Sequence, residues 1–288
     1  MGTLYLCATP IGNLQEMNSR CIDTLKQAAL ICAEDTRHTL KLLNHFGIVA
    51  KKLISYHEHN KAKQHEYILQ YLRSGQSVAL VSDAGYPGIS DPGEELVALA
   101  VAEGLNVVTI NGANAALTAL VASGIPTGTF YFAGFLPKTK KNRLQELNKL
   151  KEIDTTLILY EAPHRLEEIL ADVLAVLGDR KIAVARELTK LHEEFFRGTI
   201  SQARIWLDEQ PPRGEFVLII ASAAYSGLEQ AVEEIDEQTL LASVPTMLDK
   251  LLADGMDKKT AISSLAKKLN LPKKMVYKAT LADSDDNE

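Results

Sequence analysis

Cysteine is scarce in this sequence, with three residues in 288, and none of the three forms a C-x-x-C pair. Cys7, Cys21 and Cys32 lie instead in or beside apolar stretches. Disulfide frameworks and cysteine-based metal sites need characteristic spacings, so neither is expected here. The sequence predicts reduced thiols packed in the core of a cytoplasmic protein, with no bound metal.

Long apolar runs and an excess of basic charge are also absent. No stretch approaches the roughly 18 apolar residues of a membrane-spanning helix, and the apolar run after Met1 is too short for a signal peptide. The formal net charge of −6 by itself indicates no polyanionic partner. We therefore expect a soluble intracellular protein without a membrane partner.

The chain contains neither a P-loop nor the glycine pattern of dinucleotide-binding folds. It does contain a loop with three glycines, residues 82–93 (SDAGYPGISDPG), which carries Asp83 and no lysine or arginine. Such a loop repels phosphate and suits a neutral or cationic ligand that has hydroxyl groups and an aromatic ring. S-adenosylmethionine, a sulfonium bearing a ribose, meets this description.

The end of the same loop has the composition of a helix start. Asp91 is placed as the N-cap, Pro92 occupies the first helical position, and Glu94 follows three residues after the cap. We therefore expect Asp91 and Pro92 to have structural roles.

Short apolar runs alternate with amphipathic stretches along the first part of the chain. Strands are expected over residues 3–8, 29–33, 52–55, 77–82 and 106–110. Helices are expected over residues 21–29, 38–47 and 66–75 and after Gly93. This order predicts a mostly parallel sheet covered on both faces, with ligand-binding turns at its carboxyl edge.

A run of glycine, proline and threonine between Ser123 and Thr129 interrupts the pattern, and we place a domain boundary there. Five more strands are expected over residues 130–135, 155–160, 181–188, 193–200 and 215–222. Some of these lack long helices between them, so the second sheet is predicted to be mixed. The predicted fold class is α/β, with α/β domains at residues 1–125 and 126–224 and a small C-terminal helical module at residues 238–282.

The C-terminal module concentrates positive charge. Residues 258–278 hold seven lysines and no acidic residue, so this segment is +7 in a chain of −6 and leaves −13 for the rest. Its pattern predicts two short helices about a Leu-Pro break. A helix-turn-helix that neutralises nucleic-acid phosphates would explain this segregation of charge. A solvated helical tail is the alternative.

Ionisable residues gather where predicted strands end. Four of them follow the second strand within five positions, and residues 57–65 add three histidines whose spacing matches no standard zinc site and which suit a substrate-binding loop. The second domain contributes further charged residues at 160–165 and 185–198. As catalytic candidates we select Glu34, Asp35, His38, Arg186 and Glu187, with the acids and His38 as bases and Arg186 as a positioning residue.

These segments together resemble a known family. The sequence is similar to the ribosomal RNA small subunit methyltransferase I family, of the tetrapyrrole-methylase-like superfamily, in order along the chain as far as Ser222. The matching segments are LYLCATPIGNL, AEDTRHTLKLLNHFGI, LISYHEHN, VALVSDAGYPGISDPG, FAGFLP, YEAPHRL, VARELTKLHEEFFRGT and GEFVLII. The lysine-rich end is similar to the C-terminal module of that family.

The resemblance implies S-adenosylmethionine-dependent 2′-O-methylation of a cytidine in the decoding region of 16S rRNA, by a homodimer of two-domain subunits with the cofactor between the domains. Transferred to this sequence, the implied cofactor contacts are Pro10, Asp83, Gly85, Ile89, Ser90, Asn114, Ala115, Tyr160, Glu161, Glu215 and Phe216. For RNA phosphates we select Arg37, Arg165, Lys267, Lys268, Lys273 and Lys274.

The sequence departs from the family pattern in two of these turns. Residues 111–115 read NGANA where the family usually has PGPSA, and Tyr86 stands where a threonine is usual. The loss of two prolines predicts a less rigid turn, with either weaker cofactor binding or a cofactor contact through the backbone alone. Two other functions remain open at this point: a methyltransferase acting on a small tetrapyrrole, and a non-catalytic rRNA-binding assembly factor that has lost the cofactor.

Overall fold

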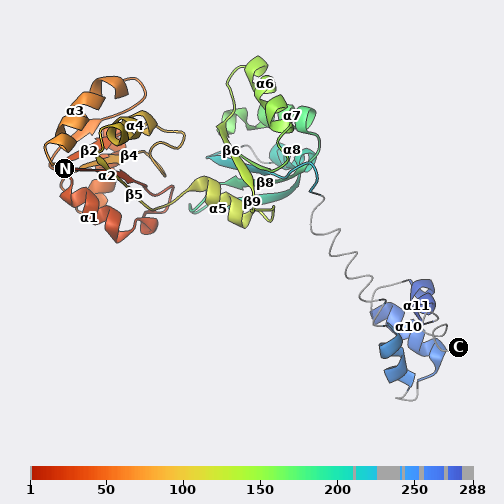
Figure 1. Ribbon diagram of the computed structural model, residues 1–288. Coiled ribbons are helices and arrows are strands. Elements are labelled where there is room, and N and C mark those ends of the chain that lie inside the picture. The colour runs from red at the N-terminus through yellow and green to blue at the C-terminus, as the bar shows by residue number, and fades with distance from the viewer. Residues whose placement is uncertain are drawn as a thin grey trace. The chain divides into compact units, whose positions relative to one another are not determined.

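A computed structural model describes residues 2–209, 212–225, 241, 244–252, 256–268 and 272–280 (Figure 1). The chain forms two compact units, Met1–Tyr225 and Ser226–Glu288. In these described ranges, no helix is both long and apolar enough to cross a lipid bilayer.

The first sheet is parallel throughout and has the strand order β3-β2-β4-β1-β5. All five strands predicted for this half of the chain are confirmed. Their bounds are β1 Thr3–Cys7, β2 Leu30–Ala33, β3 Leu53–Ser55, β4 Val78–Val81 and β5 Asn106–Ile110.

Helices cover both faces of this sheet, as the alternating pattern predicts. One face packs on α1 (Ser19–Gln27) and α2 (Thr36–His45), and the other on α3 (Lys61–Arg73) and α4 (Glu94–Ala102). Successive strand residues point to opposite faces. Ile31 accordingly joins the α1–α2 core, whereas Leu30 joins the α3–α4 core.

The three cysteines are buried and unpaired in these two cores. The predicted packed thiols are therefore confirmed.

The second sheet is mixed, as predicted, and its strand order is β6-β7-β10-β8-β9. Strands β6 and β7 are parallel, and the other neighbouring pairs are antiparallel. The strand bounds are β6 Phe130–Phe135, β7 Thr156–Glu161, β8 Lys181–Arg186, β9 Glu194–Thr199 and β10 Phe216–Ile220. The helices around this sheet are α5 Ala115–Ala122, α6 Lys140–Lys151, α7 Leu166–Leu177 and α8 Ile200–Glu209.

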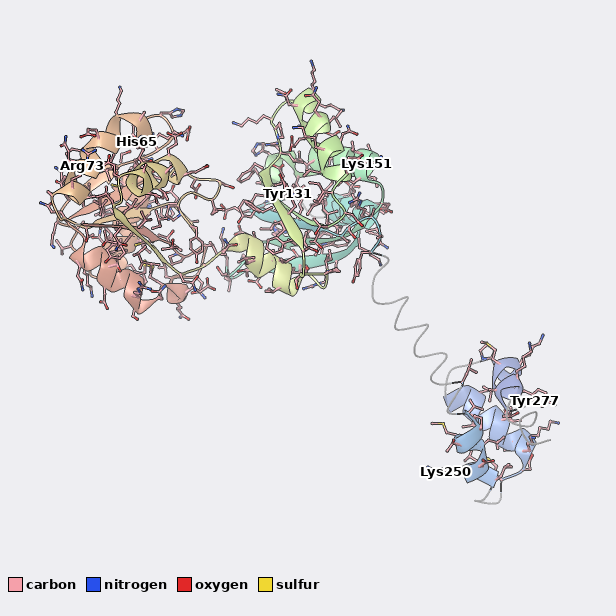
Figure 2. All side chains as sticks on the ribbon, in the orientation of Figure 1. His65, Arg73, Tyr131, Lys151, Lys250 and Tyr277 are labelled. Atoms are coloured by element: carbon pink, nitrogen blue, oxygen red, sulfur yellow. The ribbon has the colours of Figure 1, made fainter. Side chains whose placement is uncertain are left out.

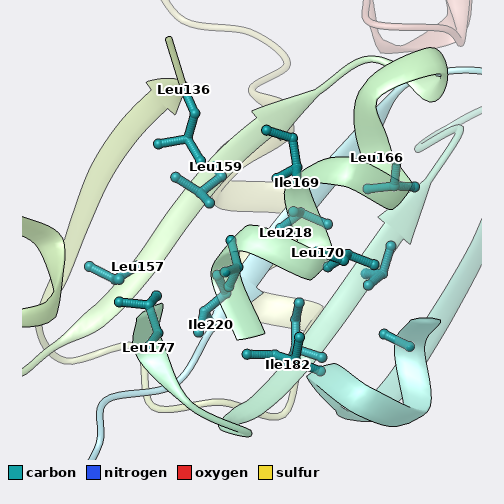
Figure 3. Packing of buried hydrophobic residues seen from close by; sticks show 14 of the residues in the cluster. Leu136, Leu157, Leu159, Leu166, Ile169, Leu170, Leu177, Ile182, Leu218 and Ile220 are labelled. Atoms are coloured by element: carbon teal, nitrogen blue, oxygen red, sulfur yellow. The ribbon is translucent and has the colours of Figure 1, made fainter. Parts of the chain in front are cut away.

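One face of the second sheet carries the largest apolar cluster of this half. Figure 3 shows Ile169 and Leu170 of α7 packed over strand residues that include Leu218. Helices α6 and α8 add Leu147, Leu150, Ile200, Ala203 and Leu207 to the same cluster.

Helix α5 packs against the opposite face of this second sheet. Ala119 and Leu120 of α5 are buried with Ile158 of β7 and Ile219 of β10. The helix precedes the boundary placed between Ser123 and Thr129, yet its contacts are with strands that follow it. The division of residues 1–224 into two domains stays a proposal.

The C-terminal unit contains short helices, which include residues 244–252, α10 (Lys258–Lys268) and α11 (Lys273–Ala279). Val244, Leu248, Ala261, Leu265 and Val276 form its apolar core. The predicted helix pair about the Leu-Pro break is confirmed, since Pro272 directly precedes α11. Between residues 258 and 278, five of the described lysines are exposed: Lys258, Lys259, Lys273, Lys274 and Lys278. Figure 2 shows its side chains, with Tyr277 labelled on α11.

Candidate functional site

The turns that follow β1 and β4 are hydrogen-bonded to each other. The Thr9 and Gly85 backbones form a two-way bridge, with N···O distances of 2.9 and 3.0 Å, and the Thr9 hydroxyl donates to the Ser82 carbonyl at 3.1 Å. Strands β1 and β4 are parallel neighbours, so their carboxyl ends meet at one edge of the sheet. These hydrogen bonds fix the glycine-rich loop, residues 82–93, at this edge.

Two glycines are required by this arrangement. Gly85 has a φ of +75°, which L side chains rarely adopt. Gly112, in the turn after β5, lies so close to the β1 turn that a Cβ would come within 2.8 Å of the Ala8 Cβ. These glycines permit the turns after three strands to pack together.

A cavity of about 350 Å³ opens at this edge, a volume within the range of roughly 300–1,000 Å³ found for small-molecule sites. Its walls come from both sheets of the first unit. The lining residues are Ile11, Glu34, Asp83, Ala84, Gly85, Tyr86, Ile89, Ser90, Asp91, Asn114, Ala115, Phe135, Tyr160, Glu161, Ala162, Pro163, Glu215, Phe216 and Val217.

The charge of the cavity has one sign. Carboxyl groups line it, and its lining contains no lysine, arginine or histidine. The five acidic residues are Glu34, Asp83, Asp91, Glu161 and Glu215. Such a site attracts a cation and repels a phosphate, as the sequence of the 82–93 loop indicates.

Glu161, at the end of β7, has an unsatisfied carboxylate oxygen. Its side chain is 1% exposed, and burial raises its pKa. The Oε1 atom accepts a hydrogen bond from the Ala162 N–H at 2.9 Å and lies 3.5 Å from Nε of Arg165. The Oε2 atom is buried and has no partner among the described residues. A buried acceptor of this kind is costly unless a ligand donates to it.

Tyr160 links the second sheet to the N-terminus of α5. Its hydroxyl accepts a hydrogen bond from the Ala116 N–H at 3.1 Å. Phe132 and Phe135 flank its ring edge-to-face, with centroid distances of 5.0 and 5.6 Å. Tyr160 and Phe135 both line the cavity and provide an aromatic wall on which a flat ring can pack.

Asp91 is not the helix cap that the sequence predicts. Helix α4 begins at Glu94 with Gly93 as its N-cap, and Gly93 has a φ of +157°. The loop folds back at this point, because Gly93 packs against Gly88 and Leu80. Asp91 therefore lines the cavity instead of capping α4, and the predicted helix start is wrong.

The pKa of Asp91 is raised to about 7, first by burial and then by the charge of Glu34. The pKa of Glu34 is also raised, first by burial and then by Asp83. Asp83 in turn accepts a hydrogen bond from the Asp35 N–H at 3.2 Å. Three acids that follow β2 and β4 thus share one side of the cavity, and their like charges help to raise the pKa values of Glu34 and Asp91.

The raised pKa of Asp91 predicts a pH-dependent loss of stability. Above its ordinary value of 3.8 the unfolded carboxyl loses its proton, whereas the folded one keeps it up to about pH 7. Stability therefore falls across this window as pH rises. Asp91→Asn removes this effect, because asparagine does not titrate. At pH 8 the variant should melt about 2–4 °C above wild type, which corresponds to about 1 kcal/mol of unfolding free energy after solvent screening. At pH 4 the two proteins should melt together; an equal shift at both pH values would contradict this origin.

The structure brings one of the five catalytic candidates to the cavity, and that residue is Glu34. Asp35 caps α2 and pairs with Arg37 at 2.7 Å, which lowers the pKa of Asp35. His38 is exposed on α2.

The remaining two catalytic candidates are engaged with the protein outside the cavity. Arg186 donates to the Arg213 carbonyl at 3.0 Å. Glu187 accepts from Lys190 Nζ at 2.8 Å and from the Glu215 N–H at 3.0 Å.

Ten of the eleven implied cofactor residues line the cavity, which collects them from the turns after β4 and β5 and from β7 and β10. They are Asp83, Gly85, Ile89, Ser90, Asn114, Ala115, Tyr160, Glu161, Glu215 and Phe216. Pro10 is not among the lining residues, and its neighbour Ile11 lines the cavity instead.

The residues selected for RNA phosphates lie in different environments. Arg37 is 87% exposed, whereas the Arg165 side chain is 16% exposed and donates to the Leu136 and Pro137 carbonyls. Lys273 and Lys274 are exposed at the start of α11. Lys267 and Lys268 end α10, and their side chains lie outside the described part of the structure.

Sequence reasoning missed Asp91, Tyr86 and Phe135 as cavity residues. The Asp-Pro-Gly-Glu pattern concealed Asp91, because that pattern is typical of a helix start. The position of Asp91 within an acidic, glycine-rich loop was the available signal. Phe135 offered no local signal, since it ends an ordinary apolar strand.

Comparison with known proteins agrees with this fold. The family model "Tetrapyrrole (Corrin/Porphyrin) Methylases" matches residues 3–204. A solved structure of uroporphyrin-III C-methyltransferase from Thermus thermophilus, complexed with S-adenyl homocysteine, is 18% identical and has a TM-score of 0.52, with 77% of this chain and 97% of that chain covered. At this identity the likeness shows a shared fold.

Two curated relatives are much closer in sequence. Ribosomal RNA small subunit methyltransferase I of Halalkalibacterium halodurans is 50% identical over 96% of this chain and 93% of its own length. The protein of the same name from Bacillus subtilis is 49% identical over 97% of this chain and 94% of its own length. The chain therefore belongs to the tetrapyrrole methylase family and, within it, to the ribosomal RNA small subunit methyltransferase I family.

Proposed function

We propose that the protein transfers a methyl group from S-adenosylmethionine to the 2′-hydroxyl of a cytidine in the decoding region of 16S rRNA. The observation that carries this proposal is the cavity at the carboxyl edge of the first sheet, which has five acidic side chains and no basic one. Membership of the rRNA methyltransferase family supports the assignment of rRNA as the substrate.

S-adenosylmethionine is the methyl donor, and its sulfonium supplies an activated methyl group when it is bound. The acidic lining attracts this cation. The unpartnered Glu161 oxygen can accept a hydrogen bond from the donor's hydroxyl or ammonium groups, and the wall of Tyr160 and Phe135 suits its adenine ring. The contacts proposed for the donor are the ten lining residues given above.

The chain must align two reactants and remove one proton. Alignment of donor and acceptor in one cavity can supply about 7–11 kcal/mol of the barrier. The proton of the attacking 2′-hydroxyl needs a base, and a base acts best when its pKa is near the working pH. Asp91, whose pKa is about 7, meets this condition inside the cavity, and the adjacent Glu34 raises that pKa. We therefore assign Asp91 as the base and Glu34 as the group that tunes it.

The exposed lysines of the C-terminal unit support the assignment of RNA as the partner. Residues 258–278 contain no acidic residue and carry five exposed positive charges, on Lys258, Lys259, Lys273, Lys274 and Lys278. Lysine contacts with phosphate give affinity without sequence selection. Recognition of the target nucleotide then depends on its 2′-hydroxyl and on an unstacked base. Arg37, which is exposed, is a further proposed phosphate contact.

The function is tested by mass mapping of ribose methylation in rRNA from cells that lack the protein. We expect one 2′-O-methylcytidine of 16S rRNA to disappear and to return when the gene is restored. The purified protein should also be stabilised by about 2.7 kcal/mol when S-adenosylmethionine is present at about 100 times its Kd. Complete methylation without the protein would overturn the rRNA assignment.

The two alternatives predict different results in these experiments. A tetrapyrrole methyltransferase would bind the cofactor but leave the rRNA pattern unchanged. A non-catalytic assembly factor would show no shift in melting temperature at millimolar cofactor. A small tetrapyrrole substrate would not require the lysine-rich C-terminal unit. A protein that had lost the cofactor would not require an intact acidic cavity.

The assembly state and location are also proposals. We infer a homodimer that acts in the cytoplasm, and the exposed aromatic residues Phe130 and Tyr131 on the edge strand β6 support an association surface. Light scattering should give twice the chain mass of 31.6 kDa; a single-chain mass at micromolar concentration would contradict the dimer.

A further inference from the structure

Tyr86 belongs to two hollows of the first unit. It lines the acidic cavity, and it also lines a more open hollow formed by residues that include Asn18, Asn111 and Gly112. Asn114 lies in both hollows as well. The loop after β4 and the turn after β5 therefore meet at the Tyr86 side chain.

The Tyr86 hydroxyl makes two hydrogen bonds to the turn after β5. It accepts from the Gly112 N–H at 3.0 Å and donates to the side-chain oxygen of Asn111. On its other side the turn is held by Asn18, whose side-chain amide donates to the Asn111 carbonyl. Asn18 is itself fixed, because it caps α1 and accepts from the Cys21 N–H at 2.8 Å.

This turn delivers two cavity residues. Asn114 caps α5 by accepting from the Leu117 N–H at 2.9 Å, and Ala115 begins the helix. Both residues line the cavity. Residues 111–115 contain no proline, so no ring restrains the backbone of the turn. Its conformation depends on the close contact of Gly112 with Ala8 and on these side-chain hydrogen bonds.

We propose that Tyr86 is a positioning residue whose hydroxyl fixes the Asn111–Ala115 turn and thereby preorganises the cofactor-binding wall formed by Asn114 and Ala115. The inference rests on the proposed function only in taking S-adenosylmethionine as the ligand of the cavity. Preorganisation of a binding wall increases affinity because the ligand need not order that wall.

Tyr86→Phe removes the hydroxyl and keeps the ring. We expect the Kd for S-adenosylmethionine, measured by calorimetry without RNA, to rise about 5–10-fold, which is the effect of losing about one net hydrogen bond. At saturating cofactor kcat should change less than twofold, so the loss should be confined to the KM for the cofactor. A loss of folding would instead lower the melting temperature and kcat together.

A double-mutant cycle locates the effect in the turn. Asn111→Ala removes the acceptor of the Tyr86 hydroxyl, so its loss of affinity should not add to that of Tyr86→Phe. Tyr277→Phe is the matched control, because Tyr277 lies exposed on α11 (Figure 2) and does not line the cavity, and we expect an unchanged Kd.

An affinity within twofold of wild type for Tyr86→Phe, or additive losses in the cycle, would overturn the positioning role. These outcomes are distinct from failure of the proposed function. If the wild-type protein binds no S-adenosylmethionine, the proposed function is wrong. If it binds and the Tyr86 variant binds equally, only the positioning role is wrong.

Discussion

Asp91→Asn should lower kcat for rRNA methylation at pH 8 by about 10²-fold or more, since a general base contributes about 10²–10⁴-fold. The variant keeps the size of the side chain and removes the group that accepts the proton. It should remain folded and be more stable than wild type at this pH. A stable but inactive protein is the expected result when an unfavourably buried carboxylate is retained for catalysis.

The pH profile of kcat gives an independent test. A carboxyl group acts as a base only when it is ionised, and the pKa of Asp91 is about 7. In the wild type kcat should therefore rise as pH increases through 7 and level off above it. Asp91→Asn should lose this limb of the profile. In Glu34→Gln the limb should move to lower pH, because removal of the Glu34 charge lowers the pKa of Asp91.

Glu94→Gln provides the control for these substitutions. Glu94 is an exposed acid three residues from Asp91 and does not line the cavity, so its kcat should equal that of wild type. If kcat of Asp91→Asn falls by less than tenfold and its pH profile still rises near pH 7, another group takes the proton. Glu34, the other acid with a raised pKa on this side of the cavity, would then be the next candidate.

Replacement of four exposed lysines of the C-terminal unit should separate RNA binding from cofactor binding. With Lys258, Lys259, Lys273 and Lys274 changed to Gln, we expect rRNA to bind about 10²-fold more weakly at 0.15 M salt. The slope of log K against log salt should decrease by about 3, because each lysine–phosphate contact with single-stranded RNA contributes about 0.7. The Kd for S-adenosylmethionine should not change, since none of the four lines the cavity.

A matched charge change on α6 supplies the comparison. Lys140, Lys141, Lys149 and Lys151 are also exposed, and their replacement by Gln removes the same four charges from the first unit. If RNA binding depends on the C-terminal unit, this variant should lose much less affinity. Equal losses in the two variants would mean that only net charge matters, and the C-terminal unit would then have no special role in RNA binding.

The secondary structure and much of the ligand site follow from local sequence. Short apolar runs, separated by amphipathic or polar stretches, predict all ten strands. The lack of basic residues in the 82–93 loop indicates an acidic ligand site. Both inferences succeed because they depend on neighbours along the chain. The resemblance adds ten proposed cofactor positions, and the structure brings all ten to one cavity.

The start of α4 shows where local pattern fails. Asp91, Pro92 and Glu94 have the composition of a capped helix start, and the cap is nevertheless at Gly93. Packing of Gly93 against Gly88 and Leu80 decides the path of the loop, and Leu80 belongs to the preceding strand β4. A pattern of four residues does not contain that contact.

By itself, then, the sequence determined the strands, the two-sided first sheet, the mixed second sheet and the charge of the cavity. Only the tertiary structure decided that Asp91 lies beside Glu34 and that Tyr86 bonds to the Asn111 turn. The reason is strand order: β2, β4, β1 and β5 are neighbours in the sheet but not along the chain. Side chains about 25–60 residues apart meet because crossover connections bring those strand ends to one edge.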